Sequence, residues 1–231
     1  MRPGRKAIVC YVTDGRALEA SRVGSGSPSL ESGSSDSFRL HVLREPIRRA
    51  IAGGVDWIQI REKDLAGGAL VELARFAVAE AGSASAQVLI NDRLDVALAA
   101  GAAGVHLGEQ SLPLSRVVEW RRSSRRTEFR IGVSCHSLEC AREAARGGAN
   151  YLFFGPVYAT PSKAAFGLPQ GIERLREVCS AIQIPVLAIG GVNAGNARAC
   201  FEAGAAGIAA IRLFQDAKEP AEIEDLRQAL E

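Results

Sequence analysis

Three polar side chains alternate along one short stretch of the chain, Gln59, Arg61 and Lys63. The residues before and between them, including Trp57 and Ile58, favour a strand. Because side chains of an extended chain point alternately to opposite faces, the amide and the two cations fall on one side. Arginine holds phosphate oxygens with a planar fork, and lysine holds them as a point charge. The stretch therefore favours a phosphate or diphosphate site, with a solvated strand end as the alternative interpretation.

A second group of candidate phosphate ligands lies further along the chain. Thr160, Ser162 and Lys163 provide two hydroxyls and a cation that could hold a phosphate from the other side. Gly190 and Gly191 follow an apolar run and expose backbone N–H groups of the kind that bind phosphate. Together the two groups of residues predict a site for more than one phosphate, with Lys163 also a candidate catalytic residue.

Asp92 is a carboxylate at the end of a predicted strand. Mg²⁺ usually binds one or two protein carboxylates together with substrate phosphates, so Asp92 is the candidate metal ligand. The alternative is an N-cap, because aspartate before the apolar helix at 94–99 suits that position. Both interpretations remain open.

Two histidines stand at predicted strand ends. His136 follows Ser134 and Cys135, and its imidazole could act as a catalytic acid or base. A structural imidazole bonded to a neighbouring loop is the alternative. His106 has apolar neighbours and is expected in the core. A nucleophilic Cys135 is not favoured, because His136 should point to the opposite side of the strand.

A repeated glycine pattern indicates which elements position these residues. Residues 53–57, 101–105, 147–151 and 204–208 each place glycine before a short apolar run, at spacings of 48, 46 and 57 residues. Glycine ends helices readily because it adopts left-handed backbone conformations without steric cost. The spacing is about twice that of one strand–helix unit, so these segments are expected to be the even-numbered strands.

The intervening strands and the helices complete an alternating series. The other strands are expected at 7–13, 87–90, 129–134 and 184–189. Helices are expected at 38–52, 68–80, 93–100, 114–121, 138–145, 172–181, 194–203 and 221–230. Eight such units predict an α/β protein, a single (β/α)8 TIM barrel over residues 1–231 with its site at the strand ends; an open doubly wound sheet is the alternative. Residues 16–37 are Ser/Gly-rich and are expected to form a mobile loop, either a linker or a lid.

Composition limits the classes of function. The 231 residues are 47% hydrophobic with a net charge of +2, so no nucleic-acid or membrane partner is indicated. Five cysteines without a Cys-x-x-Cys pair argue against a disulfide framework or zinc site, and a reducing cytoplasmic location is expected. No stretch approaches the length of a membrane span. The arginines at 121–126 are expected to be a solvated helix end.

Taken together, the strand ends resemble the thiamin phosphate synthase family and its relatives, the TenI-type thiazole tautomerases. The resemblance runs from Tyr11 to about Leu213. The motifs that carry it are Gln59-Ile60-Arg61-Glu62-Lys63, Asn91-Asp92-Arg93, Gly104-Val105-His106-Leu107-Gly108, Ile131-Gly132-Val133-Ser134, Gly155-Pro156-Val157-Tyr158 with residues 160–163, and Ala188-Ile189-Gly190-Gly191.

The resemblance implies a reaction and a ligand set. In the synthases a hydroxymethylpyrimidine diphosphate loses Mg²⁺-bound diphosphate, and the nitrogen of a thiazole phosphate attacks the pyrimidine cation. By position, Asp92 would bind magnesium. The residues implied in contacts with the diphosphate or thiazole phosphate are Gln59, Arg61, Lys63, Asn91, Ser134, Thr160, Ser162 and Lys163.

Two positions depart from the family pattern. Ser111 stands where the synthases usually have a second magnesium carboxylate, with Glu109 the nearest acid, and Arg212 stands where a small hydroxyl residue is expected. The tautomerases, in which the histidine matching His136 is thought to move protons, are therefore the alternative. Retention of Asp92 and of the Gln-x-Arg-x-Lys set favours the synthase. A non-catalytic binder of thiamin precursors is a third hypothesis, and the sequence is compatible with a homo-oligomer.

Overall fold

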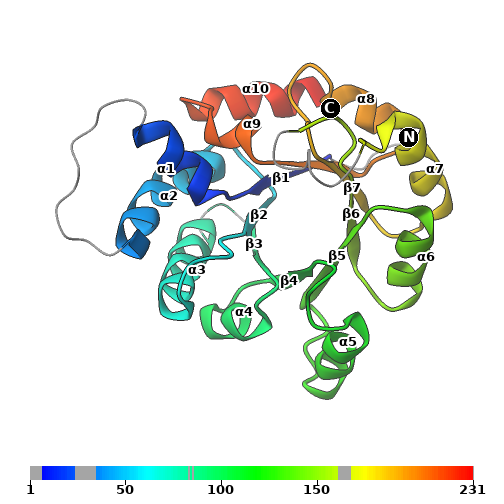
Figure 1. The fold of residues 1–231 in the computed structure, drawn as a ribbon, viewed down its shortest axis with the longest axis horizontal. Coiled ribbons are helices and arrows are strands. Elements are labelled where there is room, and N and C mark those ends of the chain that lie inside the picture. Colours follow the sequence, from blue (N-terminus) through cyan, green and yellow to red (C-terminus); the bar gives the residue numbers. More distant parts are fainter. Residues whose placement is uncertain (1–6, 24–34, 83, 85, 161–167, 231) are drawn as a thin grey trace.

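Eight parallel strands close into a barrel in the order of the chain, and helices surround it (Figure 1). The computed structural model describes residues 7–23, 35–82, 84, 86–160 and 168–230. The first strand pairs with the last, with Val9 opposite Ile208, so the sheet has no open edge. The predicted (β/α)8 barrel is therefore confirmed, and the open doubly wound sheet is wrong. Among the described residues no helix is both long and apolar enough to cross a bilayer.

The elements alternate as the glycine pattern predicts. The strands are β1 (Ile8–Val12), β2 (Trp57–Ile60), β3 (Gln87–Asn91), β4 (Gly104–Leu107), β5 (Arg130–Cys135), β6 (Tyr151–Phe154), β7 (Val186–Ile189) and β8 (Gly207–Ala210). The helices are α1 (Gly15–Val23), α2 (Ser35–Ala52), α3 (Gly67–Gly82), α4 (Leu94–Ala100), α5 (Leu114–Ser123), α6 (Leu138–Arg146), α7 (Gly171–Ala181), α8 (Ala197–Glu202), α9 (Arg212–Gln215) and α10 (Pro220–Leu230). The left-handed helix end is seen at Gly101, where φ is 69°.

The predicted Ser/Gly loop at 16–37 is wrong at both of its ends. Residues 15–23 form α1, and α2 begins at Ser35 rather than at Phe38. The carboxylate of Asp14 accepts a 3.1 Å hydrogen bond from the Ala17 N–H, which satisfies one free donor of the first helical turn. Leu18 packs against the core, so the helix has an apolar anchor that composition alone did not reveal. Residues 24–34 lie outside the described residues, and the mobility of that segment stays a prediction.

Two further differences concern the last third of the chain. Helix α8 begins at Ala197 instead of 194, because the Asn193 side chain accepts hydrogen bonds from the N–H groups of Gly195 and Asn196 and forms a turn first. Residues Arg212–Gln215 form the short helix α9, which the sequence pattern did not predict.

The barrel interior is packed with side chains and leaves no room at Gly132. The interior cluster consists of Cys10, Val12, Trp57, Leu89, Tyr151, Phe153, Leu187 and Ala209. Gly132 on β5 is paired in register with Tyr151 on β6. A Cβ atom on Gly132 would lie 2.0 Å from a ring carbon of Tyr151, so this strand needs glycine for the tyrosine ring to lie inside the barrel.

Candidate active site

Polar side chains form a row across the carboxyl ends of four neighbouring strands. Gln59 on β2 donates a 3.3 Å hydrogen bond from Nε2 to Asn91 Oδ1 on β3. On the next two strands, Nε2 of His106 and Oγ of Ser134 are 2.8 Å apart. Asn91 and His106 are register partners of β3 and β4, which joins the two pairs into one row. The structure thus brings together Gln59, Asn91 and Ser134, the three candidate ligands of β2, β3 and β5.

His106 is buried in the barrel, as its apolar neighbours predict. It is 1% exposed, and its ring centroid lies 4.3 Å from that of Phe153. Its Nδ1 is 3.1 Å from the hydroxyl of Tyr151. Burial first, and the charge of Arg61 second, lower the pKa of His106 to about 3. A neutral imidazole therefore supports Ser134 from the neighbouring strand, and both side chains occupy inward-facing positions.

Glu62, between the two candidate cations that follow β2, is a buried carboxylate to which the sequence analysis assigned no role. The Arg61 backbone N–H donates a 2.9 Å hydrogen bond to Thr13 Oγ1, whose hydroxyl donates to Glu62 at 2.6 Å. The Gly15 N–H also binds the Glu62 carboxylate, at 3.0 and 3.1 Å from its two oxygens. The Glu62 residue is 6% exposed, and this burial raises its pKa from 4.5 to about 7. Arg61 is half-buried and Lys63 is exposed beside this buried carboxylate.

Arg39 of α2 lies next to Gly15, at the start of α1. It is 7% exposed and pairs with Glu19 of α1 at 3.0 and 2.8 Å. A Cβ atom on Gly15 would lie 2.6 Å from Cγ of Arg39 and 2.8 Å from a Glu62 oxygen. Glycine at this position lets the start of α1 approach the Glu62 carboxylate. The start of α1 is therefore packed against two buried side chains, Arg39 of α2 and Glu62 after β2.

Asp92 does not cap α4, so the N-cap interpretation is wrong. The N-cap position is Arg93, and no side chain caps the helix there; Arg93 instead pairs with Asp95. Asp92 has a left-handed backbone with φ of 68°, and its N–H donates a 2.8 Å hydrogen bond to the His106 carbonyl. The helix begins only at Leu94, which places Asp92 one residue too early for capping. Asp92 is exposed at the strand end. Its left-handed backbone is a strained conformation of the kind that clusters at functional sites.

Glu109 and the two positions that differ from the family pattern, Ser111 and Arg212, lie outside the row of polar side chains. Ser111 Oγ accepts a 2.7 Å hydrogen bond from the Gly108 N–H and so closes a turn after β4. A Glu109 oxygen lies 3.7 Å from Nε2 of His136. Arg212 is exposed at the start of α9. Within the described part of the chain, no group of three or more His, Cys, Asp or Glu residues could hold a metal ion.

His136 makes the structural hydrogen bond that was one of its two interpretations. Its Nδ1 binds the carbonyl of Gly155, and because a carbonyl only accepts, Nδ1 carries the hydrogen. Nε2, on the other side of the ring, faces Glu109 and is partly exposed. The catalytic role of His136 stays a prediction.

The two glycines after β7 permit close contact with the loop that follows β6. Gly190 and Gly191 have φ of 92° and 66°, and a Cβ on Gly190 would lie 2.5 Å from Cα of Pro156. The Tyr158 N–H donates a 3.0 Å hydrogen bond to the Gly190 carbonyl. This packing brings the loop that leads to Thr160 against the end of β7. Ser162 and Lys163 lie outside the described residues, so their predicted position opposite Arg61 stays a prediction.

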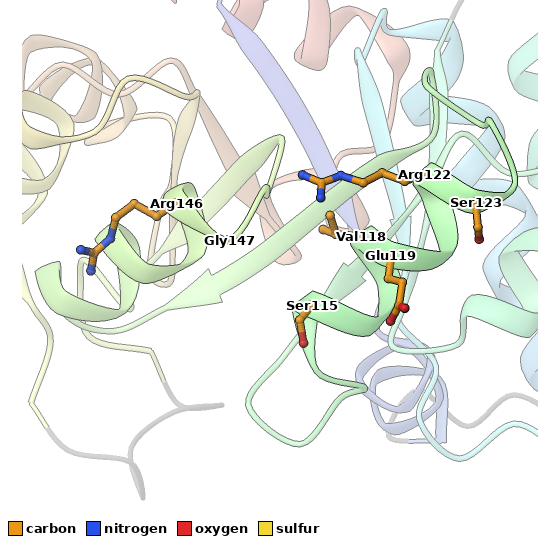
Figure 2. A pocket seen from close by; sticks show the side chains of 7 residues that line it. All are labelled: Ser115, Val118, Glu119, Arg122, Ser123, Arg146 and Gly147. Atoms are coloured by element: carbon orange, nitrogen blue, oxygen red, sulfur yellow. The ribbon is translucent and has the colours of Figure 1, made fainter.

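A groove on the outer surface is separate from the strand ends. It has a volume of about 520 Å³ and is lined by residues of α5 and of the end of α6 (Figure 2). Its lining residues are Ser115, Val118, Glu119, Arg122, Ser123, Arg146 and Gly147. None of the candidate site residues of the described strand ends is among them, so this groove is not the site discussed above.

Comparison with known proteins identifies the relatives of this chain. The family profile described as "Thiamine monophosphate synthase" matches residues 34–214. A putative thiamine-phosphate synthase of Geobacter sulfurreducens is 47% identical over 176 residues, which cover 76% of this chain and 81% of that protein. A thiamine-phosphate synthase of Moorella thermoacetica is 39% identical over 190 residues, 82% of each chain. The solved structure of thiamine phosphate pyrophosphorylase from Pyrococcus furiosus superposes with a TM-score of 0.78 at 31% identity, covering 98% of this chain and 96% of that one.

Proposed function

Because this chain belongs to the thiamine monophosphate synthase family, we propose that its strand ends bind a pyrimidine diphosphate and a thiazole phosphate and join them with release of diphosphate. The activity is that of a thiamine-phosphate synthase, a transferase of thiamine biosynthesis. The observation that carries the site assignment is the row of Gln59, Asn91, His106 and Ser134 at the strand ends, next to Arg61.

The polar row and the cations have different roles in this proposal. Gln59, Asn91 and Ser134 provide hydrogen bonds that orient the substrates. Arg61 and Lys63 bind the phosphate groups together with Thr160, Ser162 and Lys163, and Gly190 and Gly191 add backbone N–H groups. Charge accumulates on the departing diphosphate as its bond to the pyrimidine breaks. Cations that bind it more tightly at that point lower the barrier selectively.

We propose Asp92 as the protein ligand of a magnesium ion. Its exposed carboxylate is not occupied in capping α4, and Mg²⁺ needs only one or two protein carboxylates when substrate phosphates complete its oxygen ligands. When bound, the ion would neutralise charge on the diphosphate leaving group. Ser111, whose Oγ is already bonded to the Gly108 N–H, does not replace the missing second carboxylate.

His136 and Lys163 are the proposed catalytic residues. The Nε2 side of His136 is partly exposed at the end of β5, where it could exchange a proton with bound substrate. We also propose a cytoplasmic location, which the five free thiols support. Homo-oligomer formation stays a prediction.

One assay tests the proposed function. The purified protein is incubated with hydroxymethylpyrimidine diphosphate, thiazole phosphate and Mg²⁺, and thiamine phosphate is measured. Parallel samples contain the thiazole carboxylate substrate of the tautomerases, or each synthase substrate alone in a binding measurement. We expect thiamine phosphate only when both synthase substrates are present. Isomerisation of the tautomerase substrate without synthase turnover, or binding of the precursors without turnover, would contradict the proposal.

A further inference from the structure

We propose that Tyr151 and His106 form a chain of hydrogen bonds with a fixed direction, which leaves the Ser134 hydroxyl to donate its hydrogen to an anionic oxygen of the substrate. His106 is then a positioning residue that acts through Ser134. The substrate part of this inference depends on the proposed function, because that proposal places phosphorylated substrate at Ser134. The direction of the chain depends only on the barrel itself.

The first step concerns the Tyr151 hydroxyl. Tyr151 is 1% exposed. Its ring packs against the rings of Trp57 and Phe153, at centroid distances of 4.7 and 5.5 Å, and lies next to Gly132. In the part of the chain that the structure describes, the hydrogen bond of this hydroxyl is to Nδ1 of His106, at 3.1 Å. A buried O–H without an acceptor is costly, so Tyr151 donates and Nδ1 accepts.

The second step follows from the chemistry of imidazole. A neutral imidazole carries one N–H, so an accepting Nδ1 requires the hydrogen on Nε2. Nε2 lies 2.8 Å from Ser134 Oγ and therefore donates to it. A doubly protonated ring would leave the Tyr151 hydrogen without this acceptor.

The third step concerns Ser134. Its oxygen accepts from His106, so its own O–H is not needed inside the barrel and can turn toward the open end of the strands. Ser134 is half-buried, and His106, to which it is bonded, is the register partner of Asn91. A hydroxyl that donates outward suits an acceptor such as a phosphate oxygen. In the opposite arrangement, Ser134 would donate to Nε2 and would present only lone pairs, which repel an anion.

The position of the hydrogen on His106 can be measured in the free protein. In ¹⁵N-labelled protein at about neutral pH, long-range ¹H–¹⁵N correlation spectra distinguish a protonated from an unprotonated ring nitrogen. The chain has three histidines, and spectra of His41→Gln and His136→Gln assign the His106 signals by elimination. We expect hydrogen on Nε2 and none on Nδ1. Hydrogen on Nδ1 of His106 would overturn the proposal.

Variants test whether the direction of the chain matters to the substrate. Tyr151→Phe removes the donor to Nδ1, so we expect a mixture of His106 tautomers and a KM for the phosphorylated substrates raised about 3- to 10-fold. Phe153→Leu is the matched control, since it removes the other ring beside His106 without removing a hydrogen bond. The His106 tautomer should be unchanged in this variant. Ser134→Ala should keep the tautomer and raise KM by about 10- to 100-fold, because a hydrogen bond to a charged group is lost.

The double variant tests whether Tyr151 affects KM through the Ser134 hydroxyl. In the Ser134→Ala background, Tyr151→Phe should have no further effect on KM, because the two changes act through one hydroxyl. A Tyr151→Phe effect that persists at full size in that background would overturn the proposal. Failure of the proposed synthase activity would be recognised separately, because the wild-type tautomer is measured without any substrate.

Discussion

The Thr13 hydroxyl and the Glu62 carboxylate are joined by a 2.6 Å hydrogen bond that connects the end of β1 to the stretch carrying Arg61 and Lys63. The same hydroxyl accepts from the Arg61 N–H at 2.9 Å. A hydroxyl can donate once and still accept, so both bonds are satisfied together. The backbone position of Arg61 is thus linked to a buried carboxylate through the Thr13 hydroxyl.

Glu62 should make the stability of the protein depend on pH. Burial raises its folded-state pKa to about 7 from 4.5, and a group with a raised pKa stabilises the folded state fully below its unfolded pKa. That contribution is lost as the pH rises through the folded value. The free energy of unfolding attributable to Glu62 should therefore fall by on the order of 2 to 3 kcal/mol between about pH 4.5 and pH 7.

Glu62→Gln removes this titration and keeps the shape of the side chain. Urea unfolding at several pH values should show that the difference between wild type and variant changes across the same window. Glu72→Gln is the control, because Glu72 is an exposed residue of α3 that pairs with Arg44 of α2. An unaltered pH dependence in Glu62→Gln would show that this carboxylate does not titrate with a raised pKa.

Gly132→Ala should destabilise the barrel. The added Cβ would lie 2.0 Å from the Tyr151 ring, and overpacking of this kind costs roughly 1 to 3 kcal/mol or more. Gly68→Ala in α3 is the matched control, since no atom lies within 4 Å of its added Cβ and alanine favours a helix by about 1 kcal/mol. Denaturant unfolding compares the two. Equal stability of the two variants would contradict the packing described at Gly132.

Replacing the cations should weaken binding of phosphorylated substrates. Arg61→Ala, Lys63→Ala and Lys163→Ala each remove one charged hydrogen bond, worth about 1.5 to 3 kcal/mol, so Kd or KM should rise by about 10- to 100-fold. Arg122→Ala, in the outer groove, removes a cation of similar charge away from the strand ends and should leave both constants unchanged. The phosphate site would be refuted by wild-type kinetics in all three strand-end variants.

Asp92→Asn should separate metal binding from stability. Asparagine tolerates the left-handed conformation that Asp92 adopts, so the free energy of unfolding should change by less than about 0.5 kcal/mol. Activity that requires Mg²⁺ should fall, because the carboxylate charge is lost. Asp92→Ala should in addition lose about 1 kcal/mol of stability through the strained backbone. Full activity of Asp92→Asn, or of the wild type in EDTA, would contradict a magnesium role.

Cys140 should be the most reactive of the five thiols. A hydrogen bond from Cys135 lowers the pKa of Cys140 to about 7, and the residue is partly exposed. Iodoacetamide at about pH 7.5, followed by peptide mass spectrometry, should label Cys140 before the buried Cys10 and Cys200. Cys135→Ala should slow the labelling of Cys140 by about 5- to 10-fold, because the thiolate fraction decreases. Equal labelling rates in Cys135→Ala and wild type would contradict this pairing.

Much of the fold could be predicted from the sequence because its signals are local. Glycine before each even-numbered strand and the apolar runs that follow depend on backbone preferences within a few residues. Once the barrel is inferred, strand alternation alone places Gln59, Asn91 and Ser134 at one end and directs them inward. His106 could be assigned to the core because its neighbours, Val105 and Leu107, are apolar.

The tertiary structure decided how those residues are supported. Glu62 reads as one more charge in a polar stretch, and it is buried only because α1 and α2 bring Gly15 and Arg39 over it. The pairing of His106 with Ser134 depends on the register between β4 and β5, which no residue specifies by itself. Asp92 suits a helix cap by residue type, but its backbone is left-handed and the helix starts two residues further on. Local sequence determines which face a side chain occupies, whereas its partners come from segments distant in the chain and exist only once the barrel has closed.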